Sequence, residues 1–182
     1  MIHYIVIFIY LSFGWDFFIC PIASEASTKA LMEGKSTITK AALTAVFVIS
    51  LCFYVLPLLL SVLQLVNGVE ETHSTYYLTL AGVIAFWGRY MSVRSSHLLA
   101  KNLDKVFKAS FFKYSRNPIS LGTYITFLGL CLIHNTWYLW LGLVFYILNI
   151  HFKIRIEETY LLNKYGSLYG DYMKRTPRYF LL

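Results

Sequence analysis

Charge is the property that this chain has least of. Charged residues make up 14% of its 182 positions, whereas an average soluble domain carries roughly 25%. Hydrophobic residues make up 58%, which excludes a disordered chain, a coiled coil and a collagen-like fibre. Long stretches carry no charge at all. We therefore interpret the chain as a small polytopic membrane protein rather than a soluble globular domain.

Cysteine is also scarce. The three cysteines, Cys20, Cys52 and Cys131, all fall inside apolar stretches. An odd number at such positions argues against a disulfide framework, and no pair has the spacing of metal ligands. We expect three small buried side chains and no metal site.

Apolar segments predict the fold class. A bilayer core needs about 20 mostly apolar residues per helix. The candidate spans are Ile2–Ile22, Ala41–Val66, Tyr76–Val93, Ile119–Ile133 and Trp137–Phe152. The prediction is an all-α integral membrane protein with five transmembrane helices, of which the last two form a helical hairpin around a short turn, His134 to Thr136. Gly122, Gly129 and Gly142 are expected to let the hairpin helices approach each other closely.

The first span carries an acid, Asp16, and has no basic region before its apolar run. Both features argue for a membrane span rather than a cleaved signal peptide. An acid inside a span is by default a candidate for function, although the sequence offers no obvious intramembrane basic partner for it.

The basic residues predict the orientation. All 16 Lys and Arg residues lie in the regions 29–40, 89–116 and 153–178. The 67–75 loop carries only acids, Glu70 and Glu71. With five spans and an outside N-terminus, all three basic regions share one side, which the positive-inside rule makes cytoplasmic. The net charge of +7 thus reflects orientation and contact with anionic headgroups, and we expect no nucleic-acid partner.

A short motif precedes the fourth span. Asn117 followed by Pro118 is a favourable helix start, because asparagine caps free N–H groups and proline fits the first helical position. Such a start also offers N–H groups and a positive dipole end to an anion. The preceding Arg116 is suited to pair with a carboxylate or a phosphate, although arginine at a membrane interface is more often a lipid anchor.

The fifth span continues into a charged segment. Apolar residues at helical spacing predict that the helix runs past the bilayer as a cytoplasmic amphipathic helix and stops at Gly166. Within it, Glu157 and Glu158 point about 100° apart, so they do not face one ligand equally. Beside Lys153 and Arg155, such an acidic pair is usually a solvated face with local ion pairs. The alternative is that two acids just under a membrane, opposite a basic loop, hold a cationic ligand.

Tyrosines recur through the C-terminal segment, at positions 165, 169, 172 and 179. Their spacing is roughly one helical turn, which suits an interfacial aromatic belt as well as a substrate contact.

Taken in order, these motifs resemble the isoprenylcysteine carboxyl methyltransferase family, within the wider group of membrane methyltransferases that includes phospholipid methyltransferases. The resemblance covers about the C-terminal half. It rests on Arg116-Asn117-Pro118, the hairpin, Glu157-Glu158, Leu161, Tyr165-Gly166, Tyr169, Tyr172 and Arg178. It implies one membrane domain, 1–182, in which residues 1–93 form N-terminal spans and residues 94–182 form the cofactor-binding catalytic half.

The resemblance implies S-adenosylmethionine as the methyl donor, bound on the cytoplasmic side, with Glu157 as the carboxylate that holds it. We predict Arg116, Arg155 and Glu158 as catalytic residues, and Lys153 with Arg155 as contacts of the acceptor. The implied cofactor shell is His97, Asp104, Lys105, Val106, Phe107, Phe112, Asn117, Pro118, Ile119, Ser120 and Glu157.

The chemistry of this donor suits the residues. Its sulfonium and amino groups suit a carboxylate and an aromatic face such as that of Phe112. Its carboxylate suits free N–H groups at a helix start. Methyl transfer needs alignment and exclusion of water. A carboxylate acceptor needs no base at neutral pH. An amine acceptor must lose a proton first, and no base for that step is evident in the sequence.

The chain departs from the family pattern at several positions. Ser120 and Phe112 stand where tyrosine is usual, Ser110 where glycine is usual, and Lys153 where arginine is usual. The acceptor therefore stays open between the carboxyl of an isoprenylcysteine, which we favour, a phospholipid amine and a small lipophilic molecule, all reached from the lipid bilayer.

Two other functions are consistent with the sequence. Sterol-type membrane reductases share a similar helix start and closing tyrosines but use NADPH, whose phosphates the two acids would repel. A non-catalytic scaffold or small transporter is the second alternative, and Asp16 is the feature that favours it.

Overall fold

The computed structural model of the chain describes residues 2–19, 48, 55–67, 73–101 and 110–180. The side chains of residues 13–19, 99–101 and 156 lie outside this description. Secondary structure in the described parts is helical: α1 (Ile2–Ile19), a helical segment Val55–Val66, α4 (Thr75–Lys101), the short 3-10 helix η1 (Ser110–Lys113), α6 (Pro118–His134), α7 (Trp137–Tyr165) and α8 (Ser167–Arg175). The all-α prediction is confirmed for these residues.

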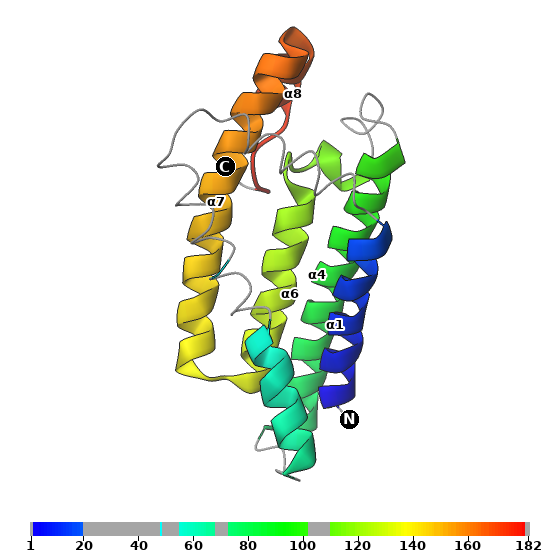
Figure 1. Ribbon diagram of the computed structural model, residues 1–182, viewed down its shortest axis with the longest axis vertical. Helices are drawn as coiled ribbons and strands as arrows, with labels where there is room; N and C mark the ends of the chain where they lie inside the picture. Colours follow the sequence, from blue (N-terminus) through cyan, green and yellow to red (C-terminus); the bar gives the residue numbers. More distant parts are fainter. Residues whose placement is uncertain (1, 20–47, 49–54, 68–72, 102–109, 181–182) are drawn as a thin grey trace.

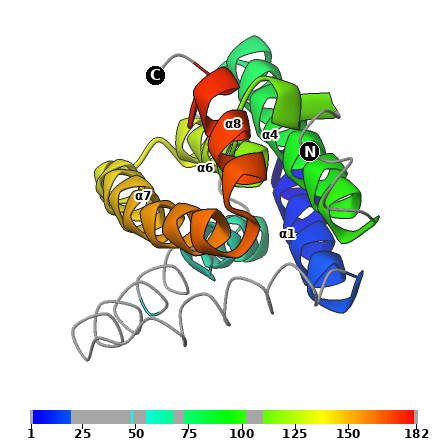
Figure 2. The same ribbon diagram turned by 90° about the horizontal axis from the view of Figure 1, so that it is seen from above.

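The long helices form a bundle. Seen from above, α6 lies between α7 and α4 (Figure 2), and α1 packs against α4 in front of it (Figure 1). α7 extends beyond the start of α6, and the small helix α8 lies across that end of the molecule, opposite the N-terminus (Figure 1). The core between the helices is apolar and includes Phe127, Leu130 and Leu139, which have no exposed surface.

The closest helix pair is α4 with α6. A Cβ added to Gly129 would meet the backbone nitrogen of Ala85 at 2.5 Å, and one added to Gly122 would meet the backbone oxygen of Gly88 at 2.6 Å. Small residues at these positions let the two backbones touch, as in other membrane helix pairs. The prediction that these glycines serve the hairpin is therefore wrong for Gly122 and Gly129, because they face α4 and not α7.

The predicted hairpin is confirmed. Asn135 ends α6 in the left-handed conformation, with φ 42°, and its N–H donates to the Cys131 carbonyl. Asparagine tolerates this conformation better than most residues. Trp137 starts α7, which runs without interruption to Tyr165, and Gly166 follows with φ 53°. The predicted helix stop at Gly166 is thus also confirmed, whereas the description of its last part as a cytoplasmic amphipathic helix stays a prediction.

At the turn end of the bundle, the side chains of three segments meet. The Nε2 atom of His134 lies 3.1 Å from the Ser61 hydroxyl, and the His134 ring stacks on His3 with centroids 6.3 Å apart. These contacts join the hairpin turn to α1 and to the Val55–Val66 segment. They lie at the opposite end from α8.

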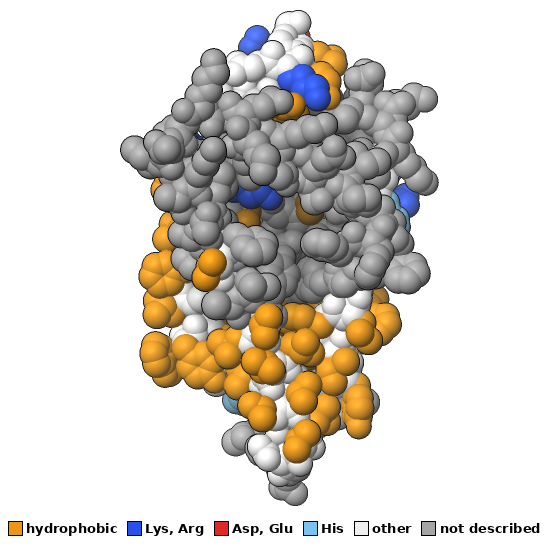
Figure 3. Space-filling model, in the orientation of Figure 1, with side chains coloured by type: hydrophobic (Ala, Val, Ile, Leu, Met, Phe, Trp, Pro, Cys, Tyr) orange, Lys and Arg blue, Asp and Glu red, His pale blue; other side chains and the backbone are white. Residues whose placement is uncertain are grey.

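The outer surface of the bundle is apolar. α7 exposes Leu141, Val144, Phe145, Leu148 and Phe152, which fall on one helix face. α1 and α4 likewise turn Tyr4, Phe8, Leu80 and Val83 outward. In Figure 3 hydrophobic side chains predominate among the described residues in the lower part of the visible face, and Lys and Arg side chains appear toward the α8 end. Exposed apolar surface of this extent is typical of contact with a membrane or with a partner protein.

Within the described residues, α7 is long and apolar enough to cross a membrane by length and composition. Shorter apolar helices are Ile2–Ser12, Val55–Val66 and Pro118–His134. The predicted third span falls within α4. Of the predicted second span, Ala41–Val66, residues 41–47 and 49–54 lie outside the described residues, and so does the Asp16 side chain. The five-span arrangement stays a prediction.

Candidate active site at the start of α6

A single buried carboxylate joins the segments at the α8 end of the bundle. Glu158, on α7, is 4% exposed. Its Oε2 accepts hydrogen bonds from Nη2 and Nε of Arg178, at 2.7 and 3.0 Å. Its Oε1 accepts one from the Asn117 amide at 3.3 Å and lies 3.4 Å from Nε of Arg116. Charge-assisted bonds of this kind are strong, and a buried carboxylate requires them.

The start of α6 follows from its sequence. Asn117 is the N-cap and Pro118 occupies the first turn, as the motif predicts. The Asn117 side chain forms no cap hydrogen bond, however, so that part of the prediction is wrong. Its amide is instead committed to Glu158. The first turn of α6 therefore has no side-chain cap on its N–H groups, which leaves the positive end of the helix available for an anion.

The residues after α8, Thr176–Phe180, form what we call the C-terminal arm. The backbone N–H of Arg116 donates to the Pro177 carbonyl at 2.9 Å. The Ser115 hydroxyl donates to the Arg178 carbonyl at 3.0 Å and accepts from the Asn117 N–H at 3.1 Å. The arm is thus fastened to the start of α6 by its backbone and to α7 by the Arg178 guanidinium.

α8 contacts the same region through Tyr172. Tyr172 is buried, and its hydroxyl donates to the Phe112 carbonyl of η1 at 2.8 Å. Burial raises the pKa of the Tyr172 hydroxyl above its ordinary value, so the group stays protonated and remains a donor. Tyr169 is buried beside it, with ring centroids 5.8 Å apart. Because Tyr169 and Tyr172 are both buried, they support neither of the two expectations for the tyrosines, an exposed interfacial belt or a free substrate surface.

The two neighbouring acids have different surroundings, as their angular separation predicts. Oε1 of Glu157 lies 3.4 Å from Nζ of Lys153, one turn earlier on α7, and both side chains are partly exposed. The geometry is that of an ion pair without a hydrogen bond, because Oε1 of Glu157 has no hydrogen-bond partner among the described residues. Glu157 is therefore the acid that remains available to a cationic ligand, whereas Glu158 is fully committed.

The remaining predicted site residues divide into three groups. Phe112 and Pro118 are buried, and Ile119 and Ser120 are half-buried at the start of α6. Arg155 is exposed on α7, three residues before Glu158. Asp104, Lys105, Val106 and Phe107 lie outside the described residues.

His97 lies near the same end. Ala85 contacts Gly129 and, farther along α4, Ser92 contacts Gly122, so the two helices run antiparallel. The next turn of α4, which carries His97, therefore lies toward the start of α6. The Nε2 atom of His97 is buried and has no hydrogen-bond partner among the described residues. A buried polar atom of this kind calls for a ligand or a water.

Two features of this end were not assigned a role from the sequence. In the sequence Arg178 contributes only to the family resemblance, because its pairing with an acid twenty residues earlier has no local sequence signature. His151 carries no motif, yet its Nδ1 atom lies 3.1 Å from the Tyr179 hydroxyl. Only the folding of the arm onto α7 brings either pair together.

The described residues thus form a helical bundle with exposed apolar side chains along its length and a charged, hydrogen-bonded cluster at one end. Comparison with protein families matches residues 76–168, just over half of the chain, to the phospholipid methyltransferase family. The chain therefore belongs to the phospholipid methyltransferase family, a family of membrane methyltransferases. No curated protein and no solved structure matches it.

The family match runs from α4 to the beginning of α8. It includes every residue that the sequence predicts for the site, from His97 to Glu158. It confirms the wider methyltransferase group to which the motifs were assigned. The arm and Arg178 lie beyond its end.

Proposed function

We propose that this protein transfers a methyl group from S-adenosylmethionine to a lipid acceptor at the membrane surface, and that the acceptor is the amine of a phospholipid headgroup. One observation carries the proposal. The Arg116-Asn117-Pro118 motif and the Glu157-Glu158 motif meet through Glu158 at one end of an otherwise apolar bundle. The family match supports the amine of a phospholipid over the isoprenylcysteine carboxyl favoured by the motifs.

The described residues fit this donor. Glu157 has a carboxylate oxygen without a hydrogen bond and suits the amino group of the donor. The uncapped first turn of α6, at Ile119 and Ser120, suits its carboxylate. The unpartnered Nε2 of His97 suits a polar group of its nucleoside. The donor, when bound, supplies an activated methyl carbon, so the protein needs to align the acceptor and exclude water.

Arg116 and Glu158 serve this site as positioning residues rather than as groups that touch the methyl. Both side chains are already engaged in the ion pairs and hydrogen bonds that hold the start of α6 against α7. Lys153 and Arg155 follow directly after the apolar part of α7. Their charges therefore lie at the depth of lipid headgroups, where they suit the phosphate of the acceptor.

The membrane arrangement is part of the same proposal. The chain forms one membrane domain that crosses the bilayer five times, with the N-terminus outside and the cofactor site and C-terminus in the cytoplasm. The clustering of basic residues supports this orientation. Labelling of single cysteines introduced at Glu70 and at Arg175 in sealed vesicles tests it, because the two positions are expected on opposite sides.

The function is tested with purified protein in lipid nanodiscs. Donor labelled in its methyl group is supplied with phosphatidylethanolamine, with a farnesylated cysteine, or with neither, and label in the extracted lipid is measured. We expect donor binding by calorimetry and label in the ethanolamine lipid. Label only in the farnesylated cysteine would reassign the acceptor to a carboxylate.

NADPH titrated in parallel distinguishes the reductase. Binding of NADPH without binding of S-adenosylmethionine would overturn the proposal. The Asp171→Asn variant serves as the matched control for variants of Glu157, because Asp171 is an exposed acid whose lysine partner is also exposed.

A further inference from the structure

The contact between α7 and the C-terminal arm supplies the base that the sequence did not reveal. An amine in a phospholipid headgroup is protonated at neutral pH, and only its neutral form has the electron pair that attacks a methyl carbon. Within the described residues, one histidine lies at the boundary between the apolar and the charged parts of α7. We propose that His151 accepts this proton and acts as the general base of the reaction; the inference rests on the proposed function.

The position of His151 along α7 corresponds to the depth of the lipid headgroups. It comes two residues before Lys153, the first charged residue of α7. Glu158 follows seven residues after His151, about 10.5 Å farther along the helix and on nearly the same face. Ile154, between them, has no exposed surface. His151 is therefore turned toward the bundle at the level where the apolar surface ends.

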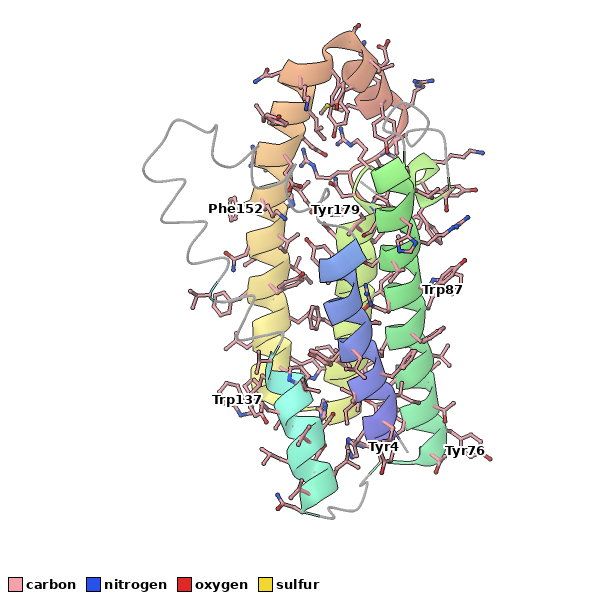
Figure 4. All side chains as sticks on the ribbon, turned by 45° about the vertical axis from the view of Figure 1, so that its right-hand side comes forward. Tyr4, Tyr76, Trp87, Trp137, Phe152 and Tyr179 are labelled. Carbon is pink, nitrogen blue, oxygen red and sulfur yellow. The ribbon has the colours of Figure 1, made fainter. Side chains whose placement is uncertain are left out.

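The arm fixes the imidazole ring. Nδ1 of His151 lies 3.1 Å from the Tyr179 hydroxyl, and the two rings are tilted against each other with centroids 6.0 Å apart. Figure 4 shows Tyr179 on the bundle side of α7, whereas Phe152 points outward. Tyr179 is held in turn by its neighbour Arg178, whose guanidinium is bound to Glu158. The ring orientation therefore depends on the same buried carboxylate that fixes the start of α6.

This contact leaves the second nitrogen available. In the reactive state Nδ1 carries a proton and donates it to the Tyr179 oxygen, so Nε2 presents its electron pair. His151 is half-buried, and Nε2 has no partner among the described residues. The ionisable groups around the ring are Arg155, one turn later on α7, Tyr179 from the arm and, in contact with Tyr179, Tyr124 from α6. The charges of Glu158 and Arg178 are paired with each other.

The spacing on α7 matches the headgroup. Arg155 lies one turn after His151, so their Cβ atoms are about 6 Å apart on one face. Arg155 is exposed and His151 is half-buried. A lipid phosphate held by Arg155 on the outside would direct its amine inward to His151. This arrangement favours an acceptor that carries a phosphate and an amine a few bonds apart.

The ammonium group of the headgroup gives one proton to Nε2 of His151. The freed nitrogen pair forms the new bond to the methyl carbon while the carbon–sulfur bond breaks, with its electrons left on sulfur. The sulfonium charge is thereby neutralised, and the product is a methylated ammonium. The imidazolium then releases its proton to water.

The test compares the wild type with His151→Gln in phosphatidylethanolamine nanodiscs. At pH 7 we expect kcat to fall about 10²- to 10⁴-fold, with the affinity for S-adenosylmethionine unchanged in calorimetry. The variant rate should rise more steeply with pH than the wild-type rate, by up to about tenfold per pH unit, because without the base the amine must lose its proton to water. His73→Gln, at the far end of α4, is the matched control and should change neither quantity.

A second measurement, the resonance of the His151 imidazole, does not depend on catalytic turnover. With the demethylated donor bound, addition of phosphatidylethanolamine should shift the His151 imidazole resonance. Phosphatidylcholine has no transferable proton and should not shift it. Tyr179→Phe keeps the ring and removes the hydroxyl, and we expect a fall in kcat of about two- to tenfold, the equivalent of one neutral hydrogen bond.

An active wild type whose His151→Gln variant keeps its rate and its pH profile would overturn the inference and leave the proposed function standing. A wild type that neither binds the donor nor methylates any lipid would overturn the proposed function itself. If His151→Gln fails to fold, an unchanged rate and an unchanged resonance shift in Tyr179→Phe would overturn the inference instead.

Discussion

Glu158 of α7 and Arg178 of the C-terminal arm are joined by two hydrogen bonds, of 2.7 and 3.0 Å, to the same carboxylate oxygen. This contact ties the last described segment of the chain to the longest helix. The other oxygen of Glu158 faces Asn117 and Arg116. One side chain thus holds together the segments from which the candidate site is built.

Loss of the Glu158 charge should therefore destabilise the protein. Glu158→Gln leaves two guanidinium groups beside a neutral amide, and we expect the free energy of unfolding to fall by about 3 kcal/mol. Thermal denaturation in detergent measures this change. Asp171→Asn, in an exposed pair with Lys174, should change stability by less than about 1 kcal/mol. Equal losses in the two variants would contradict the central role of Glu158.

The neighbouring acid should behave differently. Glu157→Gln removes a partly exposed carboxylate whose contact is Lys153 on the same helix. We expect little change in thermal stability and at least a tenfold weaker affinity for S-adenosylmethionine, measured by calorimetry, because the variant loses a charge-assisted contact. A variant that binds the donor as tightly as the wild type would remove Glu157 from the site.

The sequence predicted the backbone of this half of the molecule well. The helix start at Pro118, the turn after His134 and the stop at Gly166 are local features, encoded by proline, asparagine and glycine at positions where their backbone preferences decide the conformation. The different surroundings of Glu157 and Glu158 were also predictable, since they follow from the helical angle between adjacent residues.

The contacts between distant segments were not predictable in the same way. Arg178 reaches Glu158, and Tyr179 reaches His151, only because the arm folds back along α7. The partner of the glycines was misassigned for a related reason. Gly122 and Gly129 mark a close helix contact, but periodicity within α6 does not say which neighbour provides it.

The glycine contacts lead to a prediction about packing. Gly129→Ala places a Cβ 2.5 Å from the backbone nitrogen of Ala85, so the helices must move apart, and we expect a loss of about 1–3 kcal/mol. Gly170→Ala is the matched control. Its Cβ would meet only the end of the Leu162 side chain at 3.7 Å, and alanine favours the helix by up to about 1 kcal/mol. Thermal unfolding of both variants should therefore shift in opposite directions, and a parallel shift would contradict the close contact.

The buried tyrosine of α8 predicts a dependence on alkaline pH. Burial raises the pKa of Tyr172 in the folded protein, whereas in the unfolded chain the hydroxyl ionises near pH 10. Above that pH the unfolded state loses a proton that the folded state keeps, so ionisation favours unfolding. The stability that Tyr172 contributes is complete below pH 10 and declines as the pH rises, by up to about 1.4 kcal/mol per unit.

Tyr172→Phe isolates this effect. The variant loses the hydrogen bond to the Phe112 carbonyl, which should cost about 1 kcal/mol at pH 8. Between pH 10 and 11 its stability should then fall less steeply than that of the wild type, because one titrating group has been removed. Denaturant unfolding at fixed pH values measures both quantities. Parallel curves for the two proteins across this range would show that the Tyr172 hydroxyl is not shielded from ionisation, and that α8 does not close over η1 in solution.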